Sequence, residues 1–327
     1  MNVPILLAVM ILIVSLLVLW VSTRYTIKGV AGISRSTGMS ETSLGFILIA
    51  FTTSVPELAI TVVSSGTGAV GLAVGNLLGS NIANIGLVVG FPFLLLAIRS
   101  HGKKANNMGI RNAEMKNLYL GLLVASVIPV VLVIWSFSFK VLGAILVVSY
   151  FVVSYRLTTV RESRERESSD AASDSTNSKV IRDAIMIGLG LTGVIASSYY
   201  IVDSAVALAN IFNVSELFIG SVIIAIGTSL PELSITLAAV LKKQSGLAIG
   251  NAVGSGFTNL TLIFGILLLI SPIEIMIGGF IIPIIFTIVL NIFLWIFLLS
   301  RKLNAVGSGF LVLLYALFLF ATFSLGF

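Results

Sequence analysis

Two stretches of the chain are nearly the same sequence: GFILIAFTTSVPE at residues 45–57 and GSVIIAIGTSLPE at residues 220–232. A second pair follows them, GNLLGSNIAN at residues 75–84 and GNAVGSGFTN at residues 250–259. Both pairs align without a gap at one offset of 175 residues. Apolar bias alone does not repeat such polar motifs at one separation, so the chain contains an internal repeat.

The chain has 327 residues, of which 57% are hydrophobic and only 10% charged. A soluble protein carries about a quarter of its residues as charged types, so this is a membrane protein. Apolar runs of about 20 residues, each long enough to cross a bilayer, recur along the chain. They predict ten transmembrane helices, near 4–22, 43–66, 71–98, 117–135, 138–157, 184–208, 216–240, 246–270, 275–300 and 305–326.

The basic residues fit this span count. With ten spans, 18 of the 19 lysines and arginines fall in loops on one side of the membrane, and Lys140 lies alone on the other. By the positive-inside rule the crowded side is cytoplasmic, and both termini are extracellular. The net charge of +6 then reports orientation in the plasma membrane and not nucleic-acid binding. The charged, Ser-rich segment 158–183 is expected to be a flexible cytoplasmic linker.

Five predicted spans separate the two copies. Because five is odd, the copies enter the membrane in opposite directions, which is an inverted-topology repeat and a common build of secondary transporters. We therefore expect an all-α integral membrane protein made of two inverted five-helix repeats, with broken helices at the midplane. The first repeat is 1–157, with its repeated segment at 43–90. The second is 184–327, with its repeated segment at 216–265.

Glu57 and Glu232 lie near mid-depth in long apolar segments. A charged side chain there costs at least about 2.5 to 3.5 kcal/mol, and no lysine or arginine is predicted at that depth. A cation or a proton must therefore neutralise each carboxylate. A purely structural alternative is that both glutamates stay protonated and hydrogen-bonded.

A proline directly precedes each glutamate, and its missing N–H frees the carbonyl four residues earlier. Such breaks are tolerated in the bilayer only where protein or water lines them. Helical spacing places two hydroxyl residues on the face of each glutamate. These residues are Thr53, Ser54, Thr228 and Ser229.

The second motif carries two stripes at four-residue spacing. Its glycines form a ridge that lets another helix backbone approach closely. A polar ridge runs beside it and is expected to face the glutamates. The glycines are Gly71, Gly75, Gly79, Gly246, Gly250 and Gly254, and the polar residues are Asn76, Ser80, Asn84, Asn251, Ser255 and Asn259.

These candidate ligands offer oxygen only. The chain has no cysteine, and its single histidine, His101, lies outside the predicted spans. Oxygen ligands favour Na⁺, Ca²⁺ or Mg²⁺ over zinc or copper, and Mg²⁺ gives up its water reluctantly. Two carboxylates neutralise one Ca²⁺ or two Na⁺, which is the electrostatic condition for exchange.

At these motifs the sequence resembles the Na⁺/Ca²⁺ exchanger family of the cation/Ca²⁺ antiporter superfamily, whose two alpha-repeats correspond to 43–90 and 216–265. The resemblance implies that Glu57 and Glu232 bind both ions and that Thr53 and Thr228 bind Ca²⁺ and Na⁺. It also implies a rigid core, against which the first and sixth helices slide. The further metal ligands it implies are Ser54, Ser229, Ser80, Ser255, Asn84 at the middle of the site, its counterpart Asn259, and the carbonyls of Ala50 and Ala225.

The second copy departs from the family pattern in two places. Gly256 stands where many relatives have asparagine, and Asn259 stands where many have aspartate. The site then has two carboxylates instead of three. This departure bears on the number of Na⁺ ions exchanged for each Ca²⁺ and on any K⁺ co-transport.

The predicted function is secondary active exchange of Na⁺ for Ca²⁺ by alternating access, by a monomer with no resident cofactor. A H⁺-coupled Ca²⁺ exchanger is the nearest alternative, because glutamates at mid-depth also carry protons. A cation channel is a second. An enzyme is not expected, since no nucleophile and base can be paired in the core. Asp203, an acid near the outer end of its span, is expected to be structural or to line a water-facing vestibule.

Overall fold

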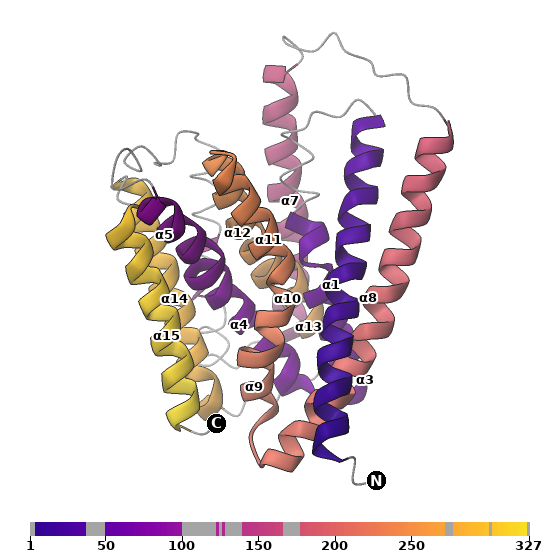
Figure 1. The fold of residues 1–327 in the computed structure, drawn as a ribbon, viewed down its shortest axis with the longest axis vertical. Helices are drawn as coiled ribbons and strands as arrows, with labels where there is room; N and C mark the ends of the chain where they lie inside the picture. Colours follow the sequence, from indigo (N-terminus) through magenta and orange to yellow (C-terminus); the bar gives the residue numbers. More distant parts are fainter. Residues whose placement is uncertain are drawn as a thin grey trace.

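The computed structural model describes residues 4–36, 50–99, 122–123, 126–127, 139–165, 177–271, 277–300 and 303–325. The regular elements of these residues are helices (Figure 1). The helices are α1 (Ile5–Ser36), α3 (Val55–Thr67), α4 (Val70–Ala83), α5 (Gly90–Arg99), α7 (Phe139–Glu165), α8 (Asn177–Phe212), α9 (Glu216–Ile219), α10 (Ala225–Thr228), α11 (Leu230–Leu241), α12 (Ser245–Thr258), α13 (Phe264–Ile270), α14 (Ile277–Leu299) and α15 (Ala305–Leu325). Three π-helical segments link some of them: η1 (Asn84–Val89), η2 (Gly220–Ile224) and η3 (Asn259–Ile263).

Six helical stretches among the described residues are long and apolar enough to cross a membrane, so this is a multi-pass membrane protein. A pair of helices bent by 43°, Glu216–Thr228 and Leu230–Leu241, forms a seventh span if counted as one. A shorter apolar helix covers Phe139–Tyr155. The predicted span 43–66 is described from residue 50 onward, and the predicted span 117–135 lies almost wholly outside the described residues.

Three helices are longer than their predicted spans. α1 continues to Ser36, α7 continues to Glu165, and α8 begins at Asn177. A helix of 32 residues is about 48 Å long, which exceeds the roughly 30 Å hydrocarbon core, so its end projects into water where charges are tolerated. Parts of the expected flexible linker, 158–183, are therefore helical, and its residues 166–176 lie outside the described residues.

The two copies are inverted in space. α1 and α8, which correspond at the offset of 175 residues, pack side by side along their length and run in opposite directions (Figure 1). The turn between α3 and α4 lies toward the end of the molecule that carries both termini, and the turn between α11 and α12 lies toward the other end. The predicted inversion of the repeats is therefore seen directly in the fold.

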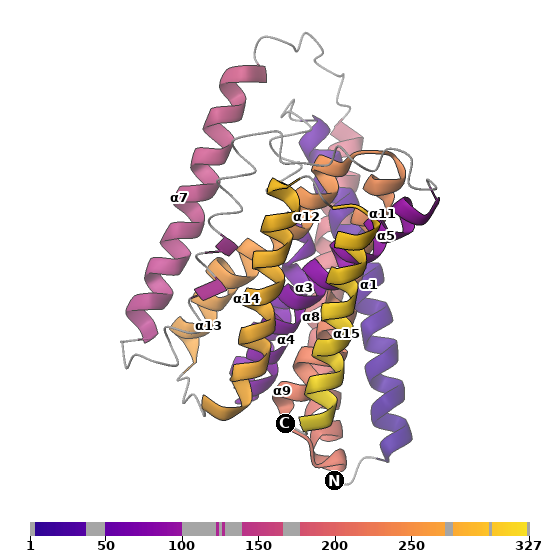
Figure 2. The same cartoon turned by 90° about the vertical axis from the view of Figure 1, so that its left-hand side faces the viewer.

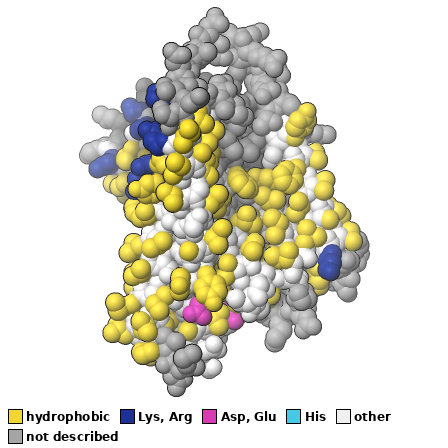
Figure 3. Space-filling view, turned by 90° about the vertical axis from the view of Figure 1, so that its right-hand side faces the viewer, with side chains coloured by type: hydrophobic (Ala, Val, Ile, Leu, Met, Phe, Trp, Pro, Cys, Tyr) yellow, Lys and Arg dark blue, Asp and Glu magenta, His cyan; other side chains and the backbone are white. Residues whose placement is uncertain are grey.

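The two helices that carry the polar ridges are central. In the Val70–Arg99 stretch, 67% of the apolar window is buried, and in Ser245–Ile270 the figure is 83%. The windows of α1, α8, α14 and α15 are only 22–39% buried. Exposed apolar side chains lie along these helices, as lipid contact requires. Apolar side chains cover much of the face that Figure 3 shows. α7 stands at the edge of the bundle against α13 (Figure 2).

Both Pro-Glu motifs interrupt a helix, as predicted. α10 ends at Thr228 and α11 starts at Leu230, while in the first copy α3 starts at Val55 after Ser54. Each proline occupies the first turn of the new helix, where its missing N–H would have had no helical partner in any case. The sequence thus places a helix start, with its positive dipole end, beside each glutamate.

The glycine ridge of α4 allows backbone contact with the bent span, as expected. A Cβ atom on Gly75 would lie 2.5 Å from the carbonyl oxygen of Leu217, and one on Gly220 would lie 2.5 Å from that of Leu72. Such distances leave no room for a side chain. In the second ridge, Gly250 and Gly254 are buried as well.

This crossing predicts a steric effect on stability. Gly75→Ala should lower the free energy of unfolding by about 1 to 3 kcal/mol, because the backbones must separate. Gly66→Ala is the matched control, since a Cβ at Gly66 would meet no atom within 4 Å. Thermal unfolding in detergent checks both variants, and equal midpoints for the two would contradict the close approach.

Candidate cation site

The two broken helices bring their glutamates into one buried site. Glu57 lies in the first turn of α3 and Glu232 in the first turn of α11, and both side chains are 0% exposed. The Oγ of Ser255, which lies 3.3 Å from Oε1 of Glu232, is also 2.9 Å from the Oγ1 of Thr53, four residues before Glu57. The predicted pairing of the mirrored acids is therefore present in the fold.

Hydroxyl pairs join the two copies across the site. The Oγ1 of Thr53 lies 2.9 Å from the Oγ of Ser255, and the Oγ1 of Thr228 lies 3.1 Å from the Oγ of Ser80. The second pair consists of the repeat counterparts of the first pair, because Thr228 corresponds to Thr53 and Ser80 corresponds to Ser255 at the offset of 175 residues. Each bond connects the broken helix of one copy to the polar ridge of the other, so the site has an approximate two-fold symmetry.

The carboxylate oxygens are poorly satisfied. The Oγ of Ser255 donates to Oε1 of Glu232 at 3.3 Å. Thr228 and Ser80 lie beside the Glu57 carboxyl, but neither of its oxygens has a partner of hydrogen-bond geometry among the described residues. The same holds for Oε2 of Glu232. Buried acceptors left in this way are expensive unless a ligand completes them.

Further predicted ligands are also buried with unpaired oxygens. The hydroxyls of Ser54 and Ser229 and the side-chain oxygens of Asn84 and Asn259 have no partner in the described part of the chain. These four residues are at most 1% exposed. Carboxylate, hydroxyl and amide oxygens are the ligands that hard cations prefer, so the donor set fits Na⁺ or Ca²⁺.

The carbonyls of Ala50 and Ala225 lie at the helix breaks. Each accepts the hydroxyl of the threonine three residues later, at 3.1 Å in the first copy and 3.3 Å in the second. Each also accepts the N–H of the residue four positions later, Ser54 or Ser229. Both alanines are buried, and every predicted site residue thus lies in the buried interior.

Two further polar residues belong to the surroundings of the site. Asn76 accepts a hydrogen bond from Thr228 at 3.1 Å, and Asn251 donates to the Glu232 carbonyl at 3.3 Å. Both residues belong to the predicted polar ridge, but the ridge alone does not predict which of its residues bind a cation and which only hydrogen-bond to those residues. Their shared offset of 175 residues was the signal in the sequence.

The described residues contain no group of three or more acidic, histidine or cysteine side chains that could hold a metal ion. The two glutamates are therefore the anionic ligands available there, in agreement with an asparagine at position 259. η1 and η3 begin at Asn84 and Asn259. π-helical turns of this kind often mark functional sites in helices.

Inverted repeats whose broken helices meet at buried polar groups define a secondary transporter of the membrane. The family model described as "Sodium/calcium exchanger protein" matches residues 7–159 and 183–324. The chain belongs to this family, whose members are transporters.

Curated relatives and solved structures agree with that assignment. The inner membrane protein YrbG of Escherichia coli is 30% identical over 275 residues, which cover 83% of this chain and 82% of the relative. The sodium/calcium exchanger MaX1 of Methanosarcina acetivorans is 28% identical over 301 residues, covering 81% and 84%. A solved structure of the sodium-calcium exchanger NCX_Mj aligns with a TM-score of 0.65 at 24% identity, over 96% of this chain and 98% of that one. This likeness confirms the predicted fold class, a ten-helix all-α membrane protein.

Proposed function

We propose that the protein is a secondary active antiporter that exchanges Na⁺ for Ca²⁺ at the site of Glu57 and Glu232. The observation that carries the proposal is the pair of mirrored, fully buried carboxylates, of whose four oxygens three have no partner among the described residues. Membership of the exchanger family and the similarity to the sodium/calcium exchanger MaX1 support it. Catalysis of a chemical reaction and a resident cofactor are not part of this proposal, and the protein acts as a monomer.

Charge balance couples the two ions. Two ionised carboxylates bind one Ca²⁺ or two Na⁺ at no net charge, and the two loads compete for the same oxygens. An empty site would carry two uncompensated charges through a low-dielectric interior, which is strongly unfavourable. The loaded forms therefore change access much more readily than the empty form, and this difference makes transport an exchange.

The ligand roles proposed here are those that the resemblance to the exchanger family implies. Glu57 and Glu232 neutralise either load. The hydroxyls of Thr53 and Thr228 contact Ca²⁺ or Na⁺. The remaining ligands in the Na⁺ coordination shells are Ser54, Ser229, Ser80, Ser255, Asn84, Asn259 and the carbonyls of Ala50 and Ala225.

We assign the movement that produces alternating access to α1 and α8. These helices pack on one another along their length and have few buried positions, whereas α4 and α12 form the buried centre. A lightly packed pair moves at lower cost than a buried one. The other helices of the two repeats, 1–157 and 184–327, then form one rigid core, against which α1 and α8 slide.

The direct test is Na⁺-gradient-driven Ca²⁺ uptake into proteoliposomes. Wild type should take up Ca²⁺, and Glu57→Gln or Glu232→Gln should reduce the rate by about 100-fold or more, because a neutral amide leaves the ion load unbalanced. Ca²⁺ should also raise the unfolding midpoint of wild type but not of either variant. Normal uptake by either variant would remove these glutamates from the site. Uptake that follows a pH gradient without Na⁺ would favour H⁺ coupling, and flux without any counter-ion would favour a channel.

Asn259 provides a second test. Asn259→Asp replaces the buried, unpaired amide of Asn259 with a third carboxylate. We expect it to change the dependence of Ca²⁺ uptake on Na⁺ concentration or to tighten Ca²⁺ binding by about tenfold, since one more anion stabilises a divalent cation. An unchanged Na⁺ and Ca²⁺ profile in the proteoliposome assay would exclude this position.

We propose that the protein lies in the plasma membrane with both termini outside. Arg24 and Lys28 lie in the second half of α1, Arg99 ends α5, and Lys242 and Lys243 follow the end of α11, whereas Lys140 lies in the first turn of α7. The later half of α1 and the ends of α5 and α11 lie toward the end of the molecule opposite the termini (Figure 1). The native chain has no cysteine, so a single cysteine placed at either terminus gives a clean probe. A membrane-impermeant thiol reagent should label both positions in intact cells, and labelling only after lysis would reverse the orientation.

A further inference from the structure

A stripe of hydroxyls continues along α3 beyond the central site. Thr61 and Ser64 follow Glu57 by four and seven residues, so all three lie on one face of the helix. At 1.5 Å per residue the stripe runs about 10 Å from Glu57 toward the end of the molecule that carries the termini. Both hydroxyls are 0% exposed. We call Thr61 and Ser64 the hydroxyl stripe.

The hydroxyls of the stripe do not take the usual helical partner. Ser65 and Thr67 of the same helix donate to the carbonyls four residues earlier, at 2.7 and 3.1 Å. Thr61 and Ser64 make no such bond and have no other partner in the described part of the chain. A buried hydroxyl without a partner carries a penalty, so it points to a ligand that is held there at some stage.

The matching position in the second copy is closed. The Nδ2 of Asn251 donates to the Oγ1 of Thr236 at 3.2 Å. In the first copy the corresponding atoms, Nδ2 of Asn76 and Oγ1 of Thr61, both lack partners among the described residues. The counterpart of Ser64 is an alanine at position 239. The stripe is thus a feature of one side of the molecule only.

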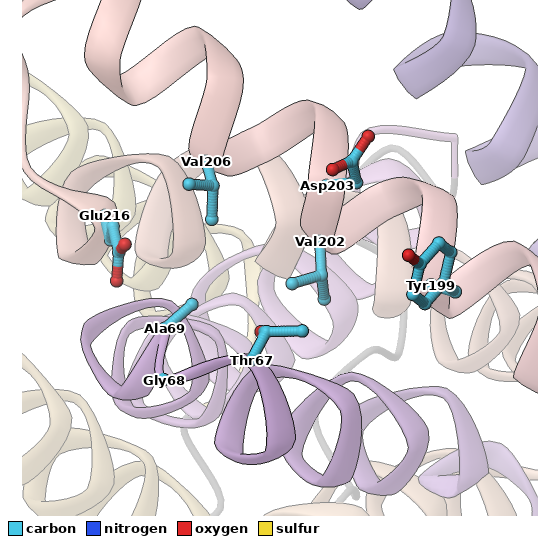
Figure 4. A pocket seen from close by; sticks show the side chains of 8 residues that line it. All are labelled: Thr67, Gly68, Ala69, Tyr199, Val202, Asp203, Val206 and Glu216. Atoms are coloured by element: carbon cyan, nitrogen blue, oxygen red, sulfur yellow. The ribbon is translucent and has the colours of Figure 1, made fainter.

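The stripe leads to an acidic pocket of about 190 Å³. Thr67 lines this pocket at the end of α3 and faces Val202 of α8 (Figure 4). The neighbouring Asp203 and, at the side, Glu216 also line it. The hydroxyl of Thr67 also donates to the carbonyl of Ser64 at 3.2 Å, so the pocket adjoins the last residue of the stripe. Carboxylates at a pocket attract cations from solution.

We propose that Thr61 and Ser64 form a transient cation-binding step between the acidic pocket and Glu57. The inference rests on the proposed exchange of Na⁺ for Ca²⁺ and assigns the stripe to ions that enter or leave on the side of the termini. Both hydroxyls are fully buried in this conformation, so the stripe must open before an ion reaches it. Ile60 of α3 and Val202 of α8 belong to one apolar cluster, and we assign the opening to a movement of α8 away from α3. The second copy offers no equivalent step toward the other side.

Side-specific transport tests this proposal. Na⁺-driven uptake of radioactive Ca²⁺ is measured in right-side-out and in everted membrane vesicles from cells that express the full chain. With Ser64→Ala or Thr61→Val, the Ca²⁺ concentration for half-maximal uptake should rise about tenfold when Ca²⁺ is applied on the side of the termini. On the opposite side it should stay within about twofold. Ser65→Ala is the matched control, because its hydroxyl already has a partner within α3.

Three outcomes would overturn the proposal. These are no shift on either side, an equal shift on both sides, and a fall in the unfolding midpoint of Ser64→Ala that would show the hydroxyl to be structural. Loss of an unpaired buried hydroxyl should leave the midpoint unchanged or raise it. Failure of the proposed function itself looks different, because wild type would then show no Na⁺-dependent Ca²⁺ uptake in either kind of vesicle.

Discussion

The central constraint on this structure is the free-energy cost of burying two carboxylates together, which comes from their desolvation and their mutual repulsion. Glu57 and Glu232 are fully buried beside one another, with no lysine or arginine among the buried residues described. Each charge is destabilised by the apolar surroundings, and each raises the energy of the other. Two features of the fold reduce this cost without removing it. The helix starts of α3 and α11 direct their positive ends toward the acids, and hydroxyls from the opposite copy lie beside them. The remaining imbalance is what a mobile cation relieves.

The two-fold symmetry of the site explains how one protein can present it to both sides of a membrane. Thr53 with Ser255 and Thr228 with Ser80 form the same contact twice, in opposite orientations. Inverted copies have two equivalent ways of packing around the site, and in the proposed mechanism small shifts of α1 and α8 exchange them. The symmetry is broken away from the centre. Thr236 is hydrogen-bonded where Thr61 is not, and this difference distinguishes the two sides in this conformation.

In the central helix α4, glycines allow close packing of the backbone and the polar residues beside them contact the site. Gly75 and Gly79 bring the backbone of α4 against η2, and this close approach places Ser80, one residue further along, within reach of Thr228. A larger side chain on the ridge would widen the crossing and separate the hydroxyl pair. The packing and the ligand geometry are therefore set by the same contact.

The sequence by itself determined the membrane class, the two inverted copies and the identity of the buried acids. These follow from local quantities: segment hydropathy, the 175-residue offset and the unfavourable burial of an unpaired charge. Helix lengths were underestimated, because hydropathy ends where charges begin, although the helix continues into water to Ser36 in α1. Only the tertiary structure decided which hydroxyl faces which, as in Thr53 with Ser255, and that Asn76 and Asn251 surround the site. Such contacts join residues far apart in the chain and depend on where two helices cross, which helical spacing within one copy does not specify.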